Sequence, residues 1–248
     1  MFTSSNASEA YRTASNYNCV LVSSRPWNSE MATRLEDRTG CCFIMLTKPE
    51  ELTQETLEGL RPQYVFFPHW SYHIPENVFN QFECVIFHMT DLPYGRGGSP
   101  LQNLIARGIY ETKISALRCV EEMDAGPIYL KKPFSLNGSA EEIYLRASEV
   151  IEDMIAEILE KSPEPMPQEG VPTGFKRRKP EDGDLAAAQT LEQAFDLIRM
   201  LDAEGYPNAF LNVGPFKIEF ARASRKTGQV VADARISLAD NLKERDKQ

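Results

Sequence analysis

The sequence contains no apolar run long enough to cross a bilayer, and its first residues lack the basic head and apolar core of a signal peptide. We therefore expect a cytoplasmic protein with no membrane partner. Cysteine is scarce and odd in number, and its spacing does not suit a metal site. This usage indicates free thiols in a reducing compartment rather than a disulfide framework. The five cysteines are Cys19, Cys41, Cys42, Cys84 and Cys119.

Nucleotide-binding and hydrolase signatures are also missing. No G-x-G-x-x-G follows the first predicted strand, no P-loop lysine motif occurs, and there is no G-x-S-x-G elbow. Histidine is limited to His69, His73 and His88. Pro68 and Pro75 flank His69 and His73, which disfavours the helix that would set the two histidines together as a metal pair. The sequence therefore predicts no dinucleotide, ATP or metal site.

Acidic residues outnumber basic residues in this chain. The 248 residues include 27 Lys and Arg against 36 Asp and Glu, which gives a net charge of −9 and a pI of about 5.0. An acidic surface repels phosphate backbones, so we expect no nucleic-acid partner. The run "KRRK" at 176–179 is a local exception. It is interpreted either as a solvated surface of a linker or as a contact for a diphosphate.

Short apolar runs alternate with helical patterns through the first half of the chain. This alternation predicts an α/β fold with a Rossmann-like, mostly parallel sheet and helices on both faces. Asn28 is expected to cap the first helix, 112–120 to form an exposed edge strand, and 126–136 to pair with it antiparallel. We expect strands at 19–24, 41–47, 63–70 and 83–89, and helices at 28–40, 48–60, 99–108 and 139–161.

Composition divides the chain into four parts. A polar flexible tail is expected at 1–16 and the main domain at 17–161. Four prolines precede the basic run in 162–184 and a fifth follows it, which is typical of a surface linker. One helical pattern and several short β-rich segments then predict a small helix-plus-β C-terminal subdomain at 185–248.

His88 is the strongest single chemical signal. It ends the buried strand "CVIFH", at the carboxyl edge where open α/β sheets bind ligands. The glycine-rich loop "LPYGRGGSP" follows directly and supplies a cation, Arg96. The alternative interpretations are a core histidine whose hydrogen bonds are satisfied, and a loop that is merely a tight turn.

Asp124 is the second signal, in the loop "EEMDAG" between two predicted strands. Asp-x-Gly alone usually marks a solvated turn. Beside His88, however, a carboxylate would fix the imidazole tautomer, as acid–base and acyl-transfer chemistry requires.

The stretches "HMTDLPYGRGGSP" (88–100) and "EEMDAGPIYLKKPFSL" (121–136) together resemble the folate-dependent formyltransferases. That family has Asn-x-His-x-Ser-x-Leu-Pro, a glycine-containing loop, and then Asp-x-Gly. The resemblance covers residues 17–236, including "FKRRKPEDGDL" and "EGYPNAF", and is nearest to the sugar N-formyltransferase of pseudaminic-acid-type pathways.

The resemblance implies formyl transfer from N10-formyltetrahydrofolate to the amine of a nucleotide-linked 4-amino-4,6-dideoxy sugar, with UDP as the expected nucleotide. It implies a homodimer and no metal. His88 and Asp124 match catalytic positions, and Thr90 matches the family serine. One position departs, because Ile86 stands where the family has asparagine. We expect His69 to replace that group, with Asn103 as a weaker alternative.

The remaining expected contacts follow from the same resemblance. Main-chain groups of two loops are expected to bind the folate pterin, at Tyr72, His73, Ile74, Glu122 and Asp124. The acceptor is expected to contact Trp27, Arg25, Thr90, Arg96, Gly97, Tyr206 and Phe210. Trp27 is equally interpretable as a core or hinge residue, and Tyr206 and Phe210 as dimer contacts.

Several functional alternatives stay open at this point. The acceptor could be methionyl-tRNA, hydroxyornithine or another small amine. The loss of the asparagine at Ile86 is compatible with an inactive folate- or nucleotide-binding homologue. A deformylase-like hydrolase that passes the formyl group to water is a further possibility.

Overall fold

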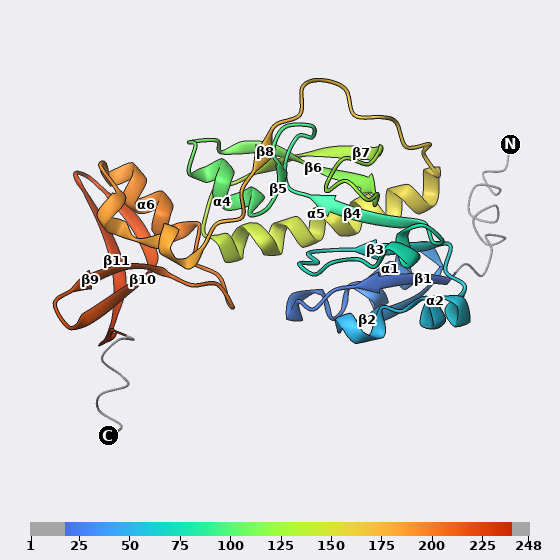
Figure 1. The fold of residues 1–248 in the computed structure, drawn as a ribbon, viewed down its shortest axis with the longest axis horizontal. Coiled ribbons are helices and arrows are strands. Elements are labelled where there is room, and N and C mark those ends of the chain that lie inside the picture. Colours follow the sequence, from blue (N-terminus) through green and yellow to red (C-terminus); the bar gives the residue numbers. More distant parts are fainter. Residues whose placement is uncertain (1–17, 240–248) are drawn as a thin grey trace, which may run out of the picture. The chain divides into compact units, whose positions relative to one another are not determined.

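The computed structural model describes residues 18–239, so the tail predicted at 1–16 lies outside the described residues (Figure 1). The chain forms two compact units. Of the described residues, the first contains 18–88, 115–132 and 148–169; the second contains 89–114, 133–147 and 170–239. Strands β6 (Glu111–Arg118) and β7 (Ile128–Ser135) and helix α5 (Ala140–Lys161) contribute residues to both.

A mostly parallel sheet forms the centre of the first unit, in the order β2-β1-β3-β4-β6-β7. The first four strands pair in parallel, with Val20 beside Ile44 and Val65, and Phe67 beside Ile86. The predicted α/β fold is therefore confirmed. These strands are β1 (Asn18–Val22), β2 (Cys42–Leu46), β3 (Tyr64–Phe67) and β4 (Cys84–His88).

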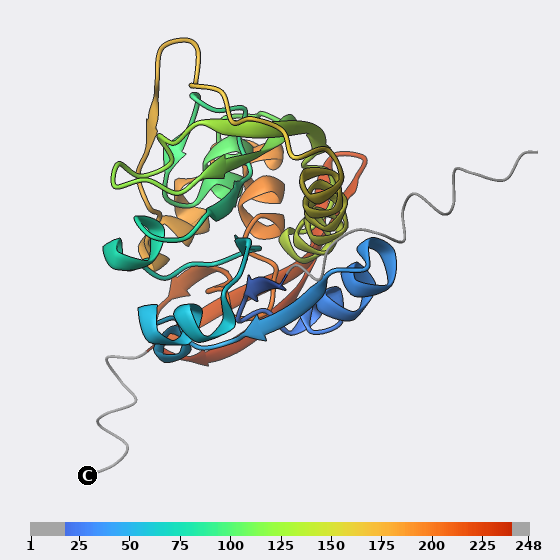
Figure 2. The same cartoon turned by 90° about the vertical axis from the view of Figure 1, so that its right-hand side faces the viewer.

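Helices cover both faces of this sheet because alternate strand residues are apolar on each side (Figure 2). Val20, Val22 and Phe67 pack with residues of α2 (Gln54–Leu60) and α3 (Glu76–Phe79). Leu21 and Phe66 point to the opposite face, where α1 (Met31–Thr39) and α5 lie. Burial on both faces explains why these strands are continuous apolar runs in the sequence.

The strand predicted at 112–120 is not an edge strand. β6 lies between β4 and β7, and its residues 114–117 are buried. It pairs antiparallel with β4, with His88 opposite Ser115. The predicted antiparallel pairing with 126–136 is confirmed by the main-chain bonds Arg118 N to Pro127 O and Leu136 N to Tyr110 O at the two ends of the hairpin.

The helical predictions need two further corrections. Asn28 does not cap α1; it ends the short 3₁₀ helix η2 (Pro26–Asn28) and is fully buried. The helix expected at 48–60 divides into η3 (Pro49–Glu51) and α2, because Thr53 caps a second start.

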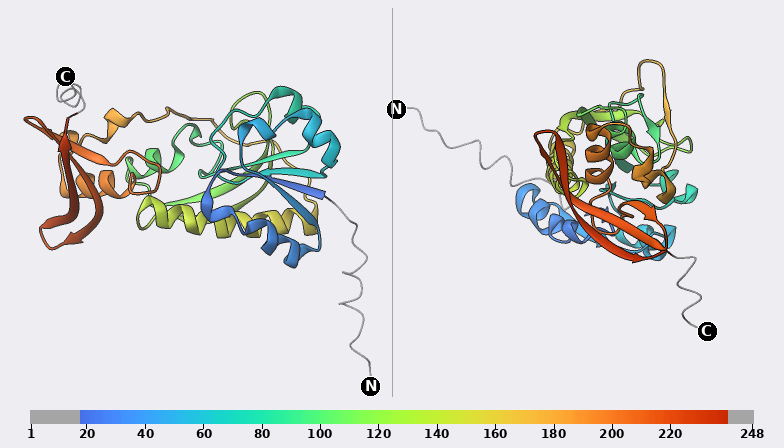
Figure 3. Two further views of the ribbon diagram at one scale, coloured as in Figure 1. Left: turned by 90° about the horizontal axis from the view of Figure 1, so that it is seen from below. Right: turned by 90° about the vertical axis from the view of Figure 1, so that its left-hand side faces the viewer.

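The second unit ends in a three-stranded antiparallel sheet, ordered β11-β10-β9 and packed against α6 (Figure 3). The small helix-plus-β subdomain is thus present. Its elements are η4 (Pro180–Gly183), η5 (Leu185–Ala187), α6 (Leu191–Arg199), β9 (Ala209–Val213), β10 (Phe216–Lys226) and β11 (Gln229–Leu238). The same unit contains α4 (Pro100–Ile105) and a two-stranded ladder of β5 (Arg96–Gly97) and β8 (Gly174–Phe175).

Three cysteines are buried in the first unit, and burial raises their thiol pKa values, to about 12 for Cys19 and about 11 for Cys119. The pKa of the Cys84 thiol rises as well, for the same reason. These groups are therefore protonated thiols at neutral pH. Among residues 18–239 no helix is long and apolar enough to cross a membrane.

Candidate functional site

His88 and Asp124 meet at the carboxyl edge of the sheet. His88 is the last residue of β4, and its Nδ1 lies 3.5 Å from Oδ2 of Asp124 in the loop between β6 and β7. Both side chains are about nine-tenths buried. The two signals that stand 36 positions apart in the sequence thus form one imidazole–carboxylate pair. The loop after β6 begins beside the start of β4, where Arg118 pairs with Val85, so it is the fold of the loop that brings Asp124 to His88.

The loop that carries Asp124 is held by two local features. Gly126 lies so close to Arg118 that a Cβ there would be 1.9 Å from its carbonyl oxygen. The Gln168 amide donates hydrogen bonds to the carbonyls of Asp124, at 2.7 Å, and Gly126, at 2.9 Å. Asp124 itself has a left-handed backbone with φ of 54°. The Asp-x-Gly signature is therefore a packing requirement as well as a chemical one.

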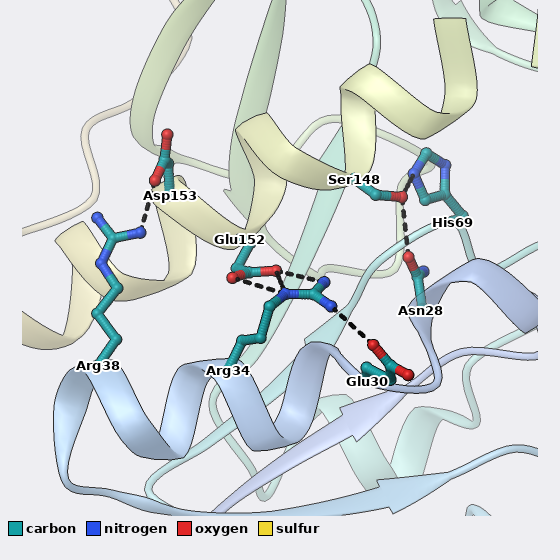
Figure 4. A network of polar contacts seen from close by, with 8 residues as sticks. All are labelled: Asn28, Glu30, Arg34, Arg38, His69, Ser148, Glu152 and Asp153. Atoms are coloured by element: carbon teal, nitrogen blue, oxygen red, sulfur yellow. Dashed lines mark hydrogen bonds and ion pairs between the residues drawn. The ribbon is translucent and has the colours of Figure 1, made fainter. Parts of the chain in front are cut away.

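His69 is held by a chain of buried polar groups in the same unit (Figure 4). The Ser148 hydroxyl of α5 donates to Asn28 Oδ1 at 2.8 Å, so its oxygen accepts from His69 Nε2–H at 3.1 Å. Asn28 in turn donates to the Ser23 hydroxyl at 2.9 Å. This arrangement assigns the proton of a neutral imidazole to Nε2 and makes Nδ1 the acceptor.

The helix that carries Ser148 is tied to α1 by ion pairs on the same face (Figure 4). Arg34 contacts the Glu152 carboxylate with two nitrogens, at 2.7 and 2.9 Å, and Arg38 contacts Asp153 at 2.5 Å. These exposed pairs contribute little stability individually. They instead fix the position of α5 against α1. Glu152 lies one helical turn after Ser148, and α1 follows Asn28 in the chain, so the ion pairs also hold Ser148 close to Asn28.

Burial lowers the pKa of His69 to about 4, and the positive charge of Arg25 adds to the effect. The unfolded chain binds a proton at this histidine near its ordinary pKa of 6.5, whereas the folded chain does not. His69 thus stabilises the fold above about pH 6.5, and that contribution is lost as the pH falls toward 4.

We predict that unfolding free energy falls by about 2 kcal/mol more in the native chain than in His69→Gln between pH 8 and pH 5. Urea unfolding at both pH values measures the difference. His73→Gln is the matched control, because His73 is an exposed histidine on the same loop. Equal pH dependence in the native chain and His69→Gln would contradict the neutral state of the partly buried His69 imidazole.

Two predicted acceptor residues lie beside His69. The Trp27 ring meets the His69 ring edge-on with centroids 6.2 Å apart, and the Arg25 guanidinium lies 5.5 Å from the Trp27 ring. They follow β1, which neighbours β3, at the same sheet edge as His88. The sheet therefore gathers Arg25, Trp27, His69 and His88 at its carboxyl edge.

The loop expected to bind the pterin follows β3. Tyr72 and His73 are exposed, Ile74 is buried in the core, and the Tyr72 ring lies 4.9 Å from the Trp70 ring. Glu122 is exposed in the loop of Asp124. The first loop leaves the carboxyl end of β3, whereas the loop of Glu122 follows β6, whose last residue, Arg118, pairs with Val85 near the start of β4.

Thr90, Arg96 and Gly97 belong to the second unit, where the glycine loop has a partner that the sequence did not reveal. β5 pairs in parallel with β8, with Arg96 beside Gly174 and Gly97 beside Phe175. Gly97 has φ of 105°, and a Cβ there would lie 2.5 Å from the Phe175 carbonyl oxygen. Close packing against the linker is therefore enough to require glycine at position 97. Thr90 is fully buried.

This pairing sets the glycine loop beside the linker segment that carries the basic run. The cations of these two segments and of the end of α4 are here named the basic strip: Arg96, Arg107, Lys176, Arg177 and Lys179. The buried amide of Asn103 donates to the Lys176 carbonyl at 2.9 Å and to the Gly98 carbonyl at 3.0 Å. The Arg107 guanidinium lies 4.5 Å from the Phe175 ring. Asn103 thus holds the linker against the glycine loop, a positioning role different from the one considered for it.

Tyr206 and Phe210 also lie in the second unit, in different surroundings. The Tyr206 ring stacks on Tyr144, and the two hydroxyls are 2.9 Å apart. Phe210 lines a hollow of about 480 Å³ on the polar face of the β9–β11 sheet, beside Asn212 and Lys217. The Lys217 ammonium lies 5.0 Å from the Phe210 ring.

Ile86 packs into the core where the resembling family has its asparagine. Its side chain contacts the cluster that includes Phe67 and Cys84. Continuing the β3–β4 register would set His69 level with His88. Strand β3 ends at Phe67, however, and His69 has a left-handed φ of 55° that accompanies its bond to Ser148.

Comparison with known proteins defines the class. Residues 180–237 match a family model described as the methionyl-tRNA formyltransferase C-terminal domain. The structure of a methionyl-tRNA formyltransferase from Clostridium thermocellum is 46% identical, with a TM-score of 0.87 over 90% of this chain and 100% of that one. A curated methionyl-tRNA formyltransferase from Thermodesulfovibrio yellowstonii is 26% identical over 170 residues. That match covers 64% of this chain.

These matches define a protein with the formyltransferase fold. The chain belongs to the formyltransferase family. It spans 55% of the length of the curated Thermodesulfovibrio relative. A sugar N-formyltransferase from Shewanella sp FDAARGOS_354 shares the fold at 17% identity, with a TM-score of 0.58 over 91% of this chain and 99% of that one.

Sequence reasoning missed the residues that position the site. Ser148 is one small polar residue in a long amphipathic helix, and Gln168 lies within a proline-rich stretch. Neither pattern carries a local signal. Asn28 did carry a local signal, but that signal predicts a helix cap. A polar residue before a helix is more often a cap than a buried hydrogen-bonded group.

Proposed function

We propose that the chain transfers a formyl group from N10-formyltetrahydrofolate to a primary amine. The amine nitrogen attacks the formyl carbon and gives a tetrahedral intermediate with an oxyanion. The bond from that carbon to folate N10 then breaks, N10 takes a proton, and the products are a formamide and tetrahydrofolate. The observation that supports this proposal is the His88–Asp124 pair at the carboxyl edge of the sheet in a formyltransferase chain.

His88 and Asp124 have complementary roles in this proposal. Asp124 faces Nδ1 of the imidazole, so Nε2 is the nitrogen assigned to the reaction, as a donor to the oxyanion or a proton carrier. Asp124 orients the ring and accepts the amine proton through water. The loops at Tyr72, His73 and Ile74 and at Glu122 bind the pterin through main-chain groups.

His69 is proposed to supply the polar group that Ile86 cannot. Its Nε2–H is committed to Ser148, which leaves Nδ1 as an acceptor in a fixed orientation. An acceptor suits the attacking amine, whose N–H bonds need orientation, better than it suits an oxyanion. His69 therefore acts on the nucleophile in this proposal, and His88 on the formyl group.

The acceptor that the comparisons support best is the amine of an aminoacyl-tRNA, as in the methionyl-tRNA formyltransferases named above. The expectation of no nucleic-acid partner rested on the total charge. Charge is uneven, however: residues 18–175 contain 13 basic and 23 acidic residues, whereas 176–238 contain 10 and 9. The basic strip gives a phosphate-bearing acceptor a local contact despite the net charge.

A nucleotide-linked 4-amino sugar is the second candidate, favoured by the net charge of −9. The acidic catalytic part opposes a long phosphate backbone, whereas a diphosphate needs only two or three cations. In the first unit, Trp27 would then pack on the sugar or base and Arg25 would contact a phosphate.

One assay separates these functions. The chain is incubated with N10-formyltetrahydrofolate and either methionyl-tRNA or a UDP-4-amino-4,6-dideoxy sugar, and tetrahydrofolate release is followed with a control that lacks any amine. Release only with methionyl-tRNA supports the first acceptor, and release only with the sugar supports the second. Release without an amine indicates a hydrolase, and no release under any condition would refute formyl transfer.

We predict that Lys176→Glu with Arg177→Glu raises the KM for the acceptor about tenfold with little change in kcat, because both side chains are exposed in the basic strip. The salt dependence of KM should also weaken. Lys48→Glu, an exposed lysine outside the strip, is the matched control. An unchanged KM in the double variant would remove the strip from acceptor binding.

A further inference from the structure

The chain of polar groups that holds His69 closes on itself through Asn28 (Figure 4). The Asn28 side chain is fully buried, so bulk water does not reach its amide. Its Oδ1 accepts from the Ser148 hydroxyl at 2.8 Å, and Ser148 bonds to the His69 imidazole at 3.1 Å. Its Nδ2 lies 3.5 Å from the main-chain oxygen of Pro68, the residue before His69. Asn28 therefore contacts both the backbone that leads into His69 and the serine that holds the imidazole.

The direction of these hydrogen bonds is set by Asn28 and not by the serine. A serine hydroxyl both donates and accepts, so with the Asn28 amide turned over Ser148 would accept from Asn28 and donate to His69. That orientation would place Oδ1 of Asn28 against the Pro68 carbonyl, and two oxygens that only accept hydrogen bonds repel each other. The Pro68 carbonyl therefore fixes the Asn28 amide, and the amide makes Ser148 the acceptor for His69 Nε2–H.

The turn after β1 holds Asn28 in this place. Asn28 ends η2, and its main-chain N–H bonds to the Arg25 carbonyl at 3.0 Å. Its Nδ2 also donates to the Ser23 hydroxyl at 2.9 Å, and the same hydroxyl accepts from the Arg25 N–H at 3.4 Å. The Asn28 amide thus has acceptors on its nitrogen side and the Ser148 hydroxyl on its oxygen side.

We propose that Asn28 is a positioning residue for formyl transfer, because it decides which nitrogen of His69 carries the proton. This inference rests on the proposed function, in which Nδ1 of His69 accepts an N–H bond of the attacking amine. An acceptor at that place leaves the lone pair of the amine available to attack the formyl carbon. In the opposite tautomer, Nδ1–H would donate to that lone pair and compete with the attack. Asn28 thus acts on the reaction through Ser148 and His69.

The test is the tautomer of His69, read from the ¹⁵N chemical shifts of its two ring nitrogens at neutral pH. The chain has three histidines, so the signals missing from His69→Gln assign this one. Its pKa is lowered to about 4, which keeps the imidazole neutral during the measurement. The native chain is expected to show a protonated Nε2 and an unprotonated Nδ1.

Asn28→Ala should shift the proton toward Nδ1, because the Ser148 hydroxyl can then donate to Nε2 of His69. The same variant should lower kcat on the order of 10²-fold and leave KM for the folate unchanged. Ser148→Thr keeps the hydroxyl and should keep both the native tautomer and kcat, whereas Ser148→Ala should lose both.

Asn18→Ala is the matched control. It removes an asparagine amide that bonds to the Leu60 carbonyl at 3.0 Å, at the start of the strand that leads to Asn28. It should leave the His69 tautomer and kcat unchanged. Circular dichroism checks that each variant is folded, and Ser148→Ala tests the same relay if Asn28→Ala does not fold.

Three results in an active native chain would overturn the role of Asn28 alone. The first is a native His69 with its proton on Nδ1. The second is a folded Asn28→Ala variant that keeps the native tautomer, and the third is one that changes the tautomer without loss of kcat. A native chain that releases no tetrahydrofolate would instead refute formyl transfer, and with it any role of Asn28 in that reaction.

Discussion

Replacing His88 with alanine is expected to lower kcat for formyl transfer by about 10²- to 10⁴-fold, the usual contribution of a positioned acid–base group. The imidazole is the group nearest the reacting atoms in the proposed mechanism, and it is held by Asp124 at 3.5 Å. Asp124→Asn should cost a similar factor, because an amide can neither accept the amine proton nor favour the same tautomer. Steady-state kinetics with saturating N10-formyltetrahydrofolate measure both.

His73→Ala is the matched control, since it removes an exposed histidine from the same unit. It should retain most of kcat, because the pterin contact proposed for this loop is made by main-chain groups that the substitution keeps. Near-native kcat in a folded His88→Ala or Asp124→Asn variant would refute the assignment of the catalytic pair.

The sequence indicated the position of His88 from topology, but no pattern in it showed how Asp124 reaches that histidine. A polar residue at the end of a buried parallel strand lies at the ligand-binding edge of the sheet, whichever residues surround it. Strand order does not bring Asp124 to that edge, because β6 runs antiparallel to β4 and its last residue, Arg118, pairs with Val85 near the start of β4. The approach of Asp124 to within 3.5 Å of His88 is therefore a property of the folded loop.

Contacts between distant segments could not be predicted in this way. The bond from Ser148 to His69 joins residues 79 positions apart, and neither lies in a pattern that indicates the other. The glycine loop illustrates the same limit. Glycines at 95–98 indicate close approach of some group, but only the structure identifies that group as the linker strand β8. The edge-strand prediction for β6 was wrong because alternation of apolar residues does not reveal how many neighbours a strand has.

Gly126→Ala is expected to have the second largest effect, on both stability and activity. The new methyl group would lie 1.9 Å from the Arg118 carbonyl oxygen, so the backbone of the loop must move. We expect a loss of about 1–3 kcal/mol of unfolding free energy from overpacking. Because Asp124 precedes Gly126 by two residues and Gln168 bonds to both carbonyls, the shift should displace the carboxylate. A displacement of about 1 Å at such a site lowers kcat on the order of 10²-fold.

Gly59→Ala is the matched control, because Gly59 lies in helix α2 with open space where its Cβ would be. Alanine there should raise the unfolding free energy by about 0.5–1 kcal/mol and leave kcat unchanged. Urea unfolding and kcat measured on both variants separate packing from chemistry. If Gly126→Ala lost stability but kept kcat, Asp124 would tolerate movement of its loop, and its role would be to orient His88 only loosely. If both quantities fell together, the close approach to Arg118 would be what fixes the carboxylate beside the imidazole.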